Sequence, residues 1–249
     1  MKNKKIGILF TSRNNYELLD YWMQEVDTEG VSVLNIDDDS TEENKKIGIE
    51  VCHKHNILYM DREERGMLNN LTTAGKYFKS KGIDWIIWFQ HDCFPLTENF
   101  FSKLDDVFSQ KSLDQFGVND TARSPLEVGD FWYRRKEYWP NSRANYANGL
   151  YNKPFAVESV AWYAAAFNID MYTEHIIPTG DYHFFHSWDD IAFQFLHKNI
   201  YNICLPEFDI KHHQQSKKQF NIPVNSPKAG ELREHYYGKW SHLDVWQER

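Results

Sequence analysis

Short apolar runs alternate with amphipathic segments of helical length through the first 110 residues of the chain. The run at 84–89 has the length of a buried strand, whereas 66–81 repeats its apolar positions with the period of a helix. This alternation predicts a parallel sheet with helices packed on its faces. The predicted strands are 6–10, 31–36, 57–60 and 84–89, and the predicted helices are 16–26, 40–55, 66–81 and 97–110.

Two of these helices are preceded by polar residues that can cap them. Ser40, with Glu43 three residues later, predicts a capping box at the start of the second helix. Thr97 is predicted to cap the fourth helix.

The pattern becomes less regular after residue 118. Residues 119–154 combine Gly, Pro and Asn with aromatic residues, which predicts a long ordered excursion, either a lid or an acceptor loop. The whole of 1–249 is nevertheless expected to form a single domain. The remaining predicted elements are a strand at 157–167, a helix at 187–198, a strand at 201–205, a polar loop at 214–227 and a terminal helix at 231–246.

Composition narrows the class of protein. Hydrophobic residues make up 41% of the 249 residues, enough for a sizeable core. Acidic residues outnumber basic residues by 36 to 28, and the net charge of -8 disfavours nucleic acid as a partner. The three cysteines lack C-x-x-C spacing, which indicates a reducing compartment. With no apolar run of about 18 residues and no signal-peptide pattern, we expect a cytoplasmic protein without a membrane span.

Aromatic residues are frequent: 9 Trp, 14 Tyr and 17 Phe account for 16% of the chain. Such residues either stack on a flat ligand, such as a sugar ring or a base, or fill a core. Trp85, Trp88 and Phe89 lie on a predicted buried strand, so we expect them in the core.

Three consecutive carboxylates, Asp37, Asp38 and Asp39, follow the second predicted strand. Ligands of open α/β sheets bind beyond the carboxyl ends of the strands. Adjacent carboxylates repel one another, so the run favours a solvated strand end or a cationic partner. One of them is a candidate to hydrogen-bond a ribose or a base edge; the alternative is a plain acidic loop leading to the Ser40 cap.

Two further strand ends carry residues that suit a metal. Asp92 follows the apolar strand 84–89, where a carboxylate is well placed to bind Mg²⁺ or Mn²⁺ together with phosphate oxygens. The alternative is a turn residue before Pro95. His212 follows a later apolar segment and is a candidate ligand for a metal or a phosphate; the alternative is a surface histidine beside His213.

Asp189 and Asp190 lie in the first turn of the predicted helix 187–198. Acidic residues suit a helix N-terminus, and Ser187 with Asp190 fits a capping box. The functional alternative is a carboxylate that acts as a general base beside Trp188.

Taken in order, these motifs resemble those of the GT-A glycosyltransferases of family 2. In that family a polar turn ends the first strand, a V-D-D-G-S-T-D-like run ends the second, and a G-x-x-x-A-x-N-like segment follows. A metal-binding D-x-D, an E-D pair, a histidine and a K-W pair come later. The matching positions here are 11–15, 36–42, 66–70, 90–92, 189–190, His212 and 239–240.

Three positions depart from the family pattern. Gln90 replaces the first Asp of D-x-D, so Asp92 alone supplies a carboxylate there. Asp39 stands where the family has glycine. The E-D pair is Asp189-Asp190, so either acid is a candidate base, and alignment with the second acid of the family favours Asp190.

The resemblance implies a GT-A (Rossmann-like) α/β fold, with a mostly parallel central sheet flanked by helices. Residues 1–118 would form the half that binds the nucleotide-sugar, and 119–249 the half that binds the acceptor, carries the base and ends in a helical tail. The implied donor-binding residues are Thr11, Arg13, Asp37, Asp38, Asn69, His91 and Lys239. The implied metal ligands are Asp92 and His212, and the implied acceptor-binding residues are Trp162, Tyr163 and Trp188.

The implied activity is transfer of a sugar from a nucleotide-diphosphate donor to an acceptor hydroxyl, with inversion and with Mn²⁺ or Mg²⁺ as cofactor. The expected donor is a UDP- or dTDP-sugar, and the expected acceptor is a glycan, a polysaccharide or a lipid-linked sugar. Attachment to the inner face of a membrane is a further expectation. The alternatives are a retaining transferase, a nucleotidyltransferase on the same fold, or a non-catalytic binding module, which Gln90 favours.

Overall fold

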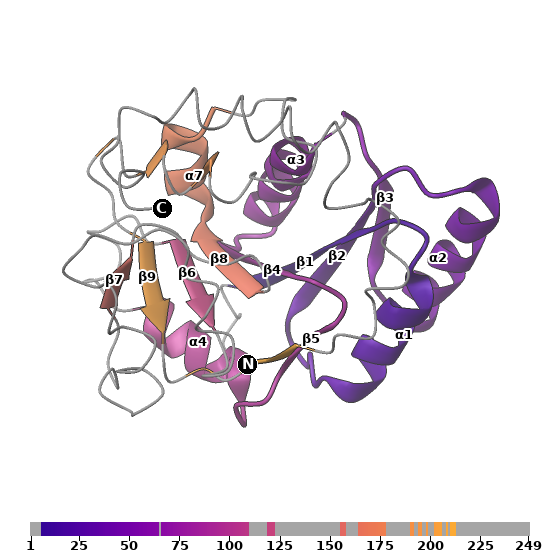
Figure 1. The fold of residues 1–249 in the computed structure, drawn as a ribbon, viewed down its shortest axis with the longest axis horizontal. Helices are drawn as coiled ribbons and strands as arrows, with labels where there is room; N and C mark the ends of the chain where they lie inside the picture. Colours follow the sequence, from indigo (N-terminus) through magenta and orange to yellow (C-terminus); the bar gives the residue numbers. More distant parts are fainter. Residues whose placement is uncertain are drawn as a thin grey trace, which may run out of the picture.

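An eight-stranded sheet forms the centre of the computed structural model (Figure 1). The structure describes residues 6–64, 66–109, 119–122, 155–157, 164–177, 202–205 and 210–212. It also describes the single residues 190, 191, 194, 195, 198 and 208. Its strands are β1 (Ile6–Ser12), β2 (Ser32–Asp37), β3 (Leu58–Asp61), β4 (Trp85–Phe89), β6 (Asn119–Ala122), β7 (Phe155–Val157), β8 (Ala164–Asn168) and β9 (Asn202–Leu205). A separate antiparallel pair consists of β5 (Cys93–Pro95) and β10 (Ile210–His212). The helices are α1 (Tyr16–Glu25), α2 (Glu42–Lys54), α3 (Met67–Ser80), α4 (Phe100–Phe108) and α7 (Ile169–His175).

The strands of the main sheet follow the order β3-β2-β1-β4-β8-β6-β9-β7. The first four of these pair in parallel, as the alternation of strand and helix predicts. β8 is antiparallel to both β4 and β6, β6 is parallel to β9, and β7 is antiparallel to β9. The sheet is therefore parallel on the N-terminal side and mixed beyond β4.

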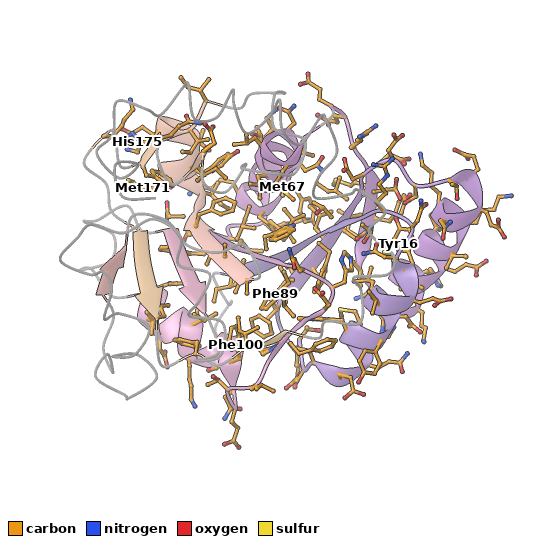
Figure 2. All side chains as sticks on the ribbon, in the orientation of Figure 1. Tyr16, Met67, Phe89, Phe100, Met171 and His175 are labelled. Carbon is orange, nitrogen blue, oxygen red and sulfur yellow. The ribbon has the colours of Figure 1, made fainter. Side chains whose placement is uncertain are left out.

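Separate hydrophobic clusters cover the two faces of the sheet. One face packs against α1, α2 and α4, and the other packs against α3 and α7. Figure 2 shows Phe89 in the middle of the molecule, where its ring centroid lies 6.0 Å from that of Phe100 on α4. Trp85, Trp88 and Phe89 are at most 2% exposed, which confirms them as core residues.

Each of the four strands and four helices predicted before residue 110 is present, but two predicted caps are wrong. The N-cap of α2 is Thr41, whose Oγ1 accepts a hydrogen bond from Asn44 N at 3.3 Å. Ser40 instead accepts from the backbone N–H of Asn14 at 3.0 Å, which ties the turn after β1 to the turn after β2. α4 begins at Phe100 with Asn99 as its N-cap, two residues after the predicted Thr97.

The second half differs more from the predictions. Within the predicted strand 157–167, β8 covers 164–167 and β7 ends at 157, while 158–163 lie outside the described residues. The predicted excursion 119–154 contains β6 at its start. α7 was not predicted, although Asn168 caps it by accepting from the N–H groups of Asp170 and Met171, both at 3.1 Å. The strand at 201–205 is confirmed as β9. The predicted loop 214–227 and terminal helix 231–246 lie outside the described residues.

Of the helix predicted at 187–198, the described residues Asp190, Ile191, Gln194 and Phe195 are helical. Ile191 and Phe195 are buried in the cluster that contains α3 and α7. None of the helices in the described part of the chain is long and apolar enough to cross a membrane.

Candidate functional site

Polar residues gather where the carboxyl ends of β1, β2 and β4 meet. β1 pairs with β2 on one side and with β4 on the other. Strands β2 and β3 are therefore added on one side of β1 and β4 on the other, so the strand order reverses at β1. Open α/β sheets bind ligands at such a reversal. Ser12, Asp37 and His91 come to this edge from the three strands.

Asp37 is buried, and its carboxylate organises the turn after β2. One oxygen accepts the backbone N–H groups of Asp39 at 3.0 Å and of Ser40 at 2.9 Å. The other oxygen accepts the hydroxyl of Tyr16. All of these partners belong to the protein, so Asp37 holds the turn in shape whatever else binds there.

A glycine on α2 makes room for Tyr16. A Cβ atom at Gly48 would lie 2.3 Å from the Tyr16 ring, far inside van der Waals contact. The glycine therefore lets the Tyr16 ring approach α2 closely while its hydroxyl reaches Asp37. The pKa of Tyr16 is raised well above its usual range, mainly by burial and to a smaller extent by the neighbouring Asp37 carboxylate.

The other two carboxylates of the acidic run share one cation, Arg62, at the end of β3. Its guanidinium lies 3.1 Å from Asp38 Oδ1 and 3.0 Å from Asp39 Oδ2. The expected cationic partner is thus present, and sequence reasoning did not identify which residue it is. Asp39 has a φ of 77°, the left-handed region that glycine occupies at no steric cost, at the position where the family pattern has glycine.

His91 sits at the centre of a buried chain of hydrogen bonds that joins the three strand ends. Its Nε2 lies 2.7 Å from Ser12 Oγ, and its Nδ1 lies 3.2 Å from Asn15 Nδ2. Ser12 Oγ in turn donates to Asn35 Oδ1 on β2. The His91 ring is 5% exposed and packs 5.1 Å from the ring of Phe10 on β1.

The direction of this chain follows from chemistry. Asn15 Oδ1 accepts the backbone N–H of Arg13 at 3.0 Å, so the amide nitrogen of Asn15 is the atom that faces His91. An amide nitrogen only donates, so His91 Nδ1 accepts and Nε2 carries the proton toward Ser12. Burial lowers the pKa of His91 to about 4, so the ring is neutral at pH 7. Neither ring nitrogen is left to contact a ligand directly.

Asp92 follows His91 on a tightly held turn. Cys93 N donates to Gln90 O at 3.0 Å, and the Trp22 indole of α1 donates to Cys93 O at 2.7 Å. The register of β5 and β10 sets His212 opposite Cys93, one residue from Asp92 along the chain. Asp92 itself is 6% exposed. The fold thus brings together the backbones of the two predicted metal ligands, Asp92 and His212, although they lie far apart in the sequence.

The described residues contain no group of three or more His, Cys, Asp or Glu side chains placed to hold a metal ion. One carboxylate and one imidazole are nevertheless a suitable donor set for a cation that takes its other ligands from a diphosphate. Mg²⁺ characteristically binds through one or two carboxylates plus substrate phosphates. The residues therefore fit a metal that arrives with its nucleotide.

Three more of the predicted donor-binding residues, Thr11, Arg13 and Asn69, belong to the described part of the chain. Thr11 is half-buried, and its Oγ1 accepts the indole N–H of Trp88 at 3.1 Å. Arg13 is exposed in the turn after β1, and Asn69 is half-buried in the first turn of α3. α3 starts from Gly66, whose φ of 113° and ψ of 147° suit glycine almost exclusively.

Asp190 is fully buried, and its neighbour Ile191 packs in the cluster that contains α3 and α7. Gln194 Nε2 donates to Asp190 Oδ2 at 2.7 Å. The same amide accepts from Ile177 N at 2.8 Å and donates to Ile177 O at 3.3 Å. Gln194 therefore fixes Asp190 against the segment that follows α7.

Several predicted site residues lie outside the described part of the chain, and His212 is described only through its backbone. Conversely, sequence reasoning did not identify Arg62 or Asn35, and it included Ser12 and Asn15 only as members of the polar turn 11–15. A buried strand such as 32–37 that contains an asparagine is unusual, and this was the available sign that Asn35 has a polar partner. The predicted site residues outside the described part are Asp189, Trp162, Tyr163, Trp188 and Lys239.

The same fold occurs in nucleotide-sugar enzymes of known structure. The mannosyltransferase PcManGT from Pyrobaculum calidifontis, in complex with GDP-Man and Mn²⁺, is 13% identical with a TM-score of 0.60; the match covers 96% of this chain and 64% of that one. Glucosyl-3-phosphoglycerate synthase from Mycobacterium tuberculosis, in complex with Mn²⁺, UDP and glucosyl-3-phosphoglycerate, is 9% identical with a TM-score of 0.55, and the match covers 98% and 81%. The present chain thus spans 64% of the length of the mannosyltransferase.

These likenesses establish the fold. The chain has the fold of the GT-A type glycosyltransferases, an α/β fold with a mostly parallel central sheet flanked by helices, as the order of motifs predicts. No protein-family model matches the sequence, and no curated protein matches it either. Membership of family 2 stays a prediction.

Proposed function

We propose that this protein is a glycosyltransferase that moves a sugar from a nucleotide-diphosphate donor to an acceptor hydroxyl, with inversion at the anomeric carbon. The observation that carries the proposal is the placement of Asp92. It lies on a rigid turn at the reversal of the sheet, and the β5–β10 register sets His212 beside that turn. A carboxylate and a histidine at that point are the residues a metal-bound diphosphate requires.

In this proposal Asp92 and His212 hold Mn²⁺ or Mg²⁺ together with the diphosphate of the donor. The metal, when bound, neutralises the negative charge that develops on the leaving nucleoside diphosphate. The complexes of the mannosyltransferase with GDP-Man and Mn²⁺, and of the synthase with Mn²⁺ and UDP, support a divalent metal as cofactor. A cation also explains how an acidic protein accepts an anionic donor.

The edge formed by β1, β2 and α3 would bind the nucleotide. Both oxygens of Asp37 are engaged by protein partners, so the half-buried Asp38, which pairs with Arg62, is the acid proposed to meet a ribose or base edge. Asp37 and His91, although predicted as donor contacts, would support the site from within because their polar atoms face protein partners. Thr11, Arg13, Asn69 and Lys239 complete the proposed donor site.

Asp190 or Asp189 would act as the general base. The carboxylate takes the proton of the acceptor hydroxyl, whose oxygen forms the new bond to the anomeric carbon as the bond to the diphosphate breaks. Attack from the face opposite the diphosphate inverts the configuration. Trp162, Tyr163 and Trp188 are the proposed acceptor contacts, since aromatic rings stack on sugar rings.

The donor class proposed is a UDP- or dTDP-sugar, and the acceptor class is a carbohydrate or a lipid-linked sugar of a polysaccharide pathway. We propose that the protein acts in the cytoplasm, at the inner face of a membrane when the acceptor is lipid-linked. Gln90 keeps one rival open, a module that binds nucleotide-sugars without turning them over, because it removes a carboxylate at the position where the family pattern has one.

A thermal-shift experiment tests the metal-bound donor site. Because Asp92 and His212 are only two ligands, we expect Mn²⁺ alone or UDP alone to change the unfolding temperature little, and the pair to raise it strongly. Saturation at about 100 times Kd adds about 2.7 kcal/mol, or roughly 5–10 °C for a chain of this size. UDP, dTDP and GDP are compared with and without Mn²⁺. Equal shifts with and without Mn²⁺, or no shift with any nucleotide, would contradict the proposal.

A further inference from the structure

We propose that His91 is a positioning residue: through Ser12 and Asn15 it fixes the backbone that carries Asp92, and so sets the affinity of the donor site for Mn²⁺. This inference rests on the proposed function, since it concerns the metal that the function requires. It assigns to His91 a role different from the direct donor contact that the sequence suggests.

The first step is that His91 has no freedom to turn. Ser12, Asn15 and Asn35 are all buried. His91 is hydrogen-bonded to Ser12 and to Asn15, and Ser12 is hydrogen-bonded to Asn35. Rotation of the ring would break two hydrogen bonds in a place where water has little access to replace them. Unsatisfied buried polar groups are costly, so the ring holds a single orientation.

The second step is that Asp92 lies between two fixed points of the backbone. His91 is fixed on the N-terminal side by the chain of hydrogen bonds. On the C-terminal side, Cys93 is fixed by the Trp22 indole at 2.7 Å and by its pairing with β10. The backbone of Asp92 therefore has one position relative to β1 and to His212, which is what a ligand set needs before the metal arrives.

Three substitutions of His91 test its two hydrogen bonds individually. His91→Gln can keep the donation to Ser12, His91→Asn can keep the acceptance from Asn15, and His91→Leu keeps neither. Binding of Mn²⁺ in the presence of saturating UDP, and of GDP, is measured by the loss of the free Mn²⁺ EPR signal. We expect His91→Leu to weaken Mn²⁺ binding about 10- to 100-fold, the typical cost of losing a group that orients a metal ligand. The Gln and Asn variants are expected to lie between His91→Leu and the native protein.

Phe108→Leu is the matched control. Phe108 is buried and stacks on Trp85 at 4.1 Å, at the end of β4 opposite His91, so this variant loses core packing without touching the site. We expect it to lower the unfolding temperature and to leave Mn²⁺ affinity unchanged. Comparison with this control separates a loss of Mn²⁺ affinity from a general loss of folding stability. If His91→Leu fails to fold, the Gln and Asn variants of His91 provide the Mn²⁺ affinities for the test.

The outcomes distinguish the two proposals. If the native protein binds Mn²⁺ with UDP or GDP and the His91 variants bind it equally well, the positioning role is wrong and the proposed function stands. If the variants lose nucleotide affinity in the absence of Mn²⁺, His91 contacts the donor directly and the positioning role is again wrong. If the native protein binds no Mn²⁺ with either nucleotide, the metal-assisted function fails, and this inference fails with it.

Discussion

Replacing Asp92 by Asn is expected to lower kcat for sugar transfer about a thousandfold while leaving the fold intact. Asn has the same shape as Asp, so the turn held by Trp22 and β10 keeps its geometry. The substitution removes the one carboxylate of the degenerate D-x-D motif. A metal that stabilises a leaving diphosphate contributes several kcal/mol, and each 1.4 kcal/mol corresponds to tenfold in rate. Initial rates of nucleoside diphosphate release, at saturating donor and Mn²⁺, measure the effect.

Gln90→Asp is the complementary variant. It restores the carboxylate of the family pattern, and we expect it to lower the Mn²⁺ concentration needed for half-maximal rate, because a second carboxylate adds a hard oxygen ligand. Undiminished transfer by Asp92→Asn at every Mn²⁺ concentration would show that Asp92 is not the metal ligand.

The second large effect is expected at the pair Asp189 and Asp190. Replacing the general base by Asn should lower kcat by about 10²- to 10⁴-fold. Donor affinity should stay unchanged, because the base contacts the acceptor hydroxyl. Asp189→Asn and Asp190→Asn are compared by single-turnover transfer together with nucleotide binding.

For Asp190, the structure supplies a matched control. Asp190 accepts a hydrogen bond from Gln194 at 2.7 Å, and an Asn at this position still offers an oxygen to Gln194. Asp190→Leu offers none, so it should lower the unfolding temperature whether or not Asp190 is the base. If neither Asn variant changes the rate of transfer, the assignment of the base to this pair is wrong.

The N-terminal half of the fold was predictable because each element there carries its own pattern. β4 is a continuous apolar strand, and α3 buries one face along its length, so local periodicity sufficed. β5 and β10 have three residues each, and their pairing joins segments far apart in the sequence. A strand of three residues has no measurable period.

The sequence singles out the acids of the proposed site but not the residues that support them. Asp37, Asp38 and Asp92 stand at strand ends, where function concentrates in this class of sheet. No local sequence pattern identifies Arg62 or Asn35, because their contacts form only when β1, β2 and β3 lie side by side. For the same reason the motif suggested a ligand contact for His91, whereas both of its ring nitrogens face Ser12 and Asn15.

The central claim is tested most directly by incubating the protein with UDP-, dTDP- and GDP-sugars in the presence of Mn²⁺ and identifying the nucleotide product. We expect one donor class to release nucleoside diphosphate, with the sugar passing to water slowly and to a hydroxyl acceptor faster. Asp92→Asn should abolish this release. Pyrophosphate exchange in place of diphosphate release would identify a nucleotidyltransferase, and binding without turnover of any donor would identify a binding module; either result would contradict the account.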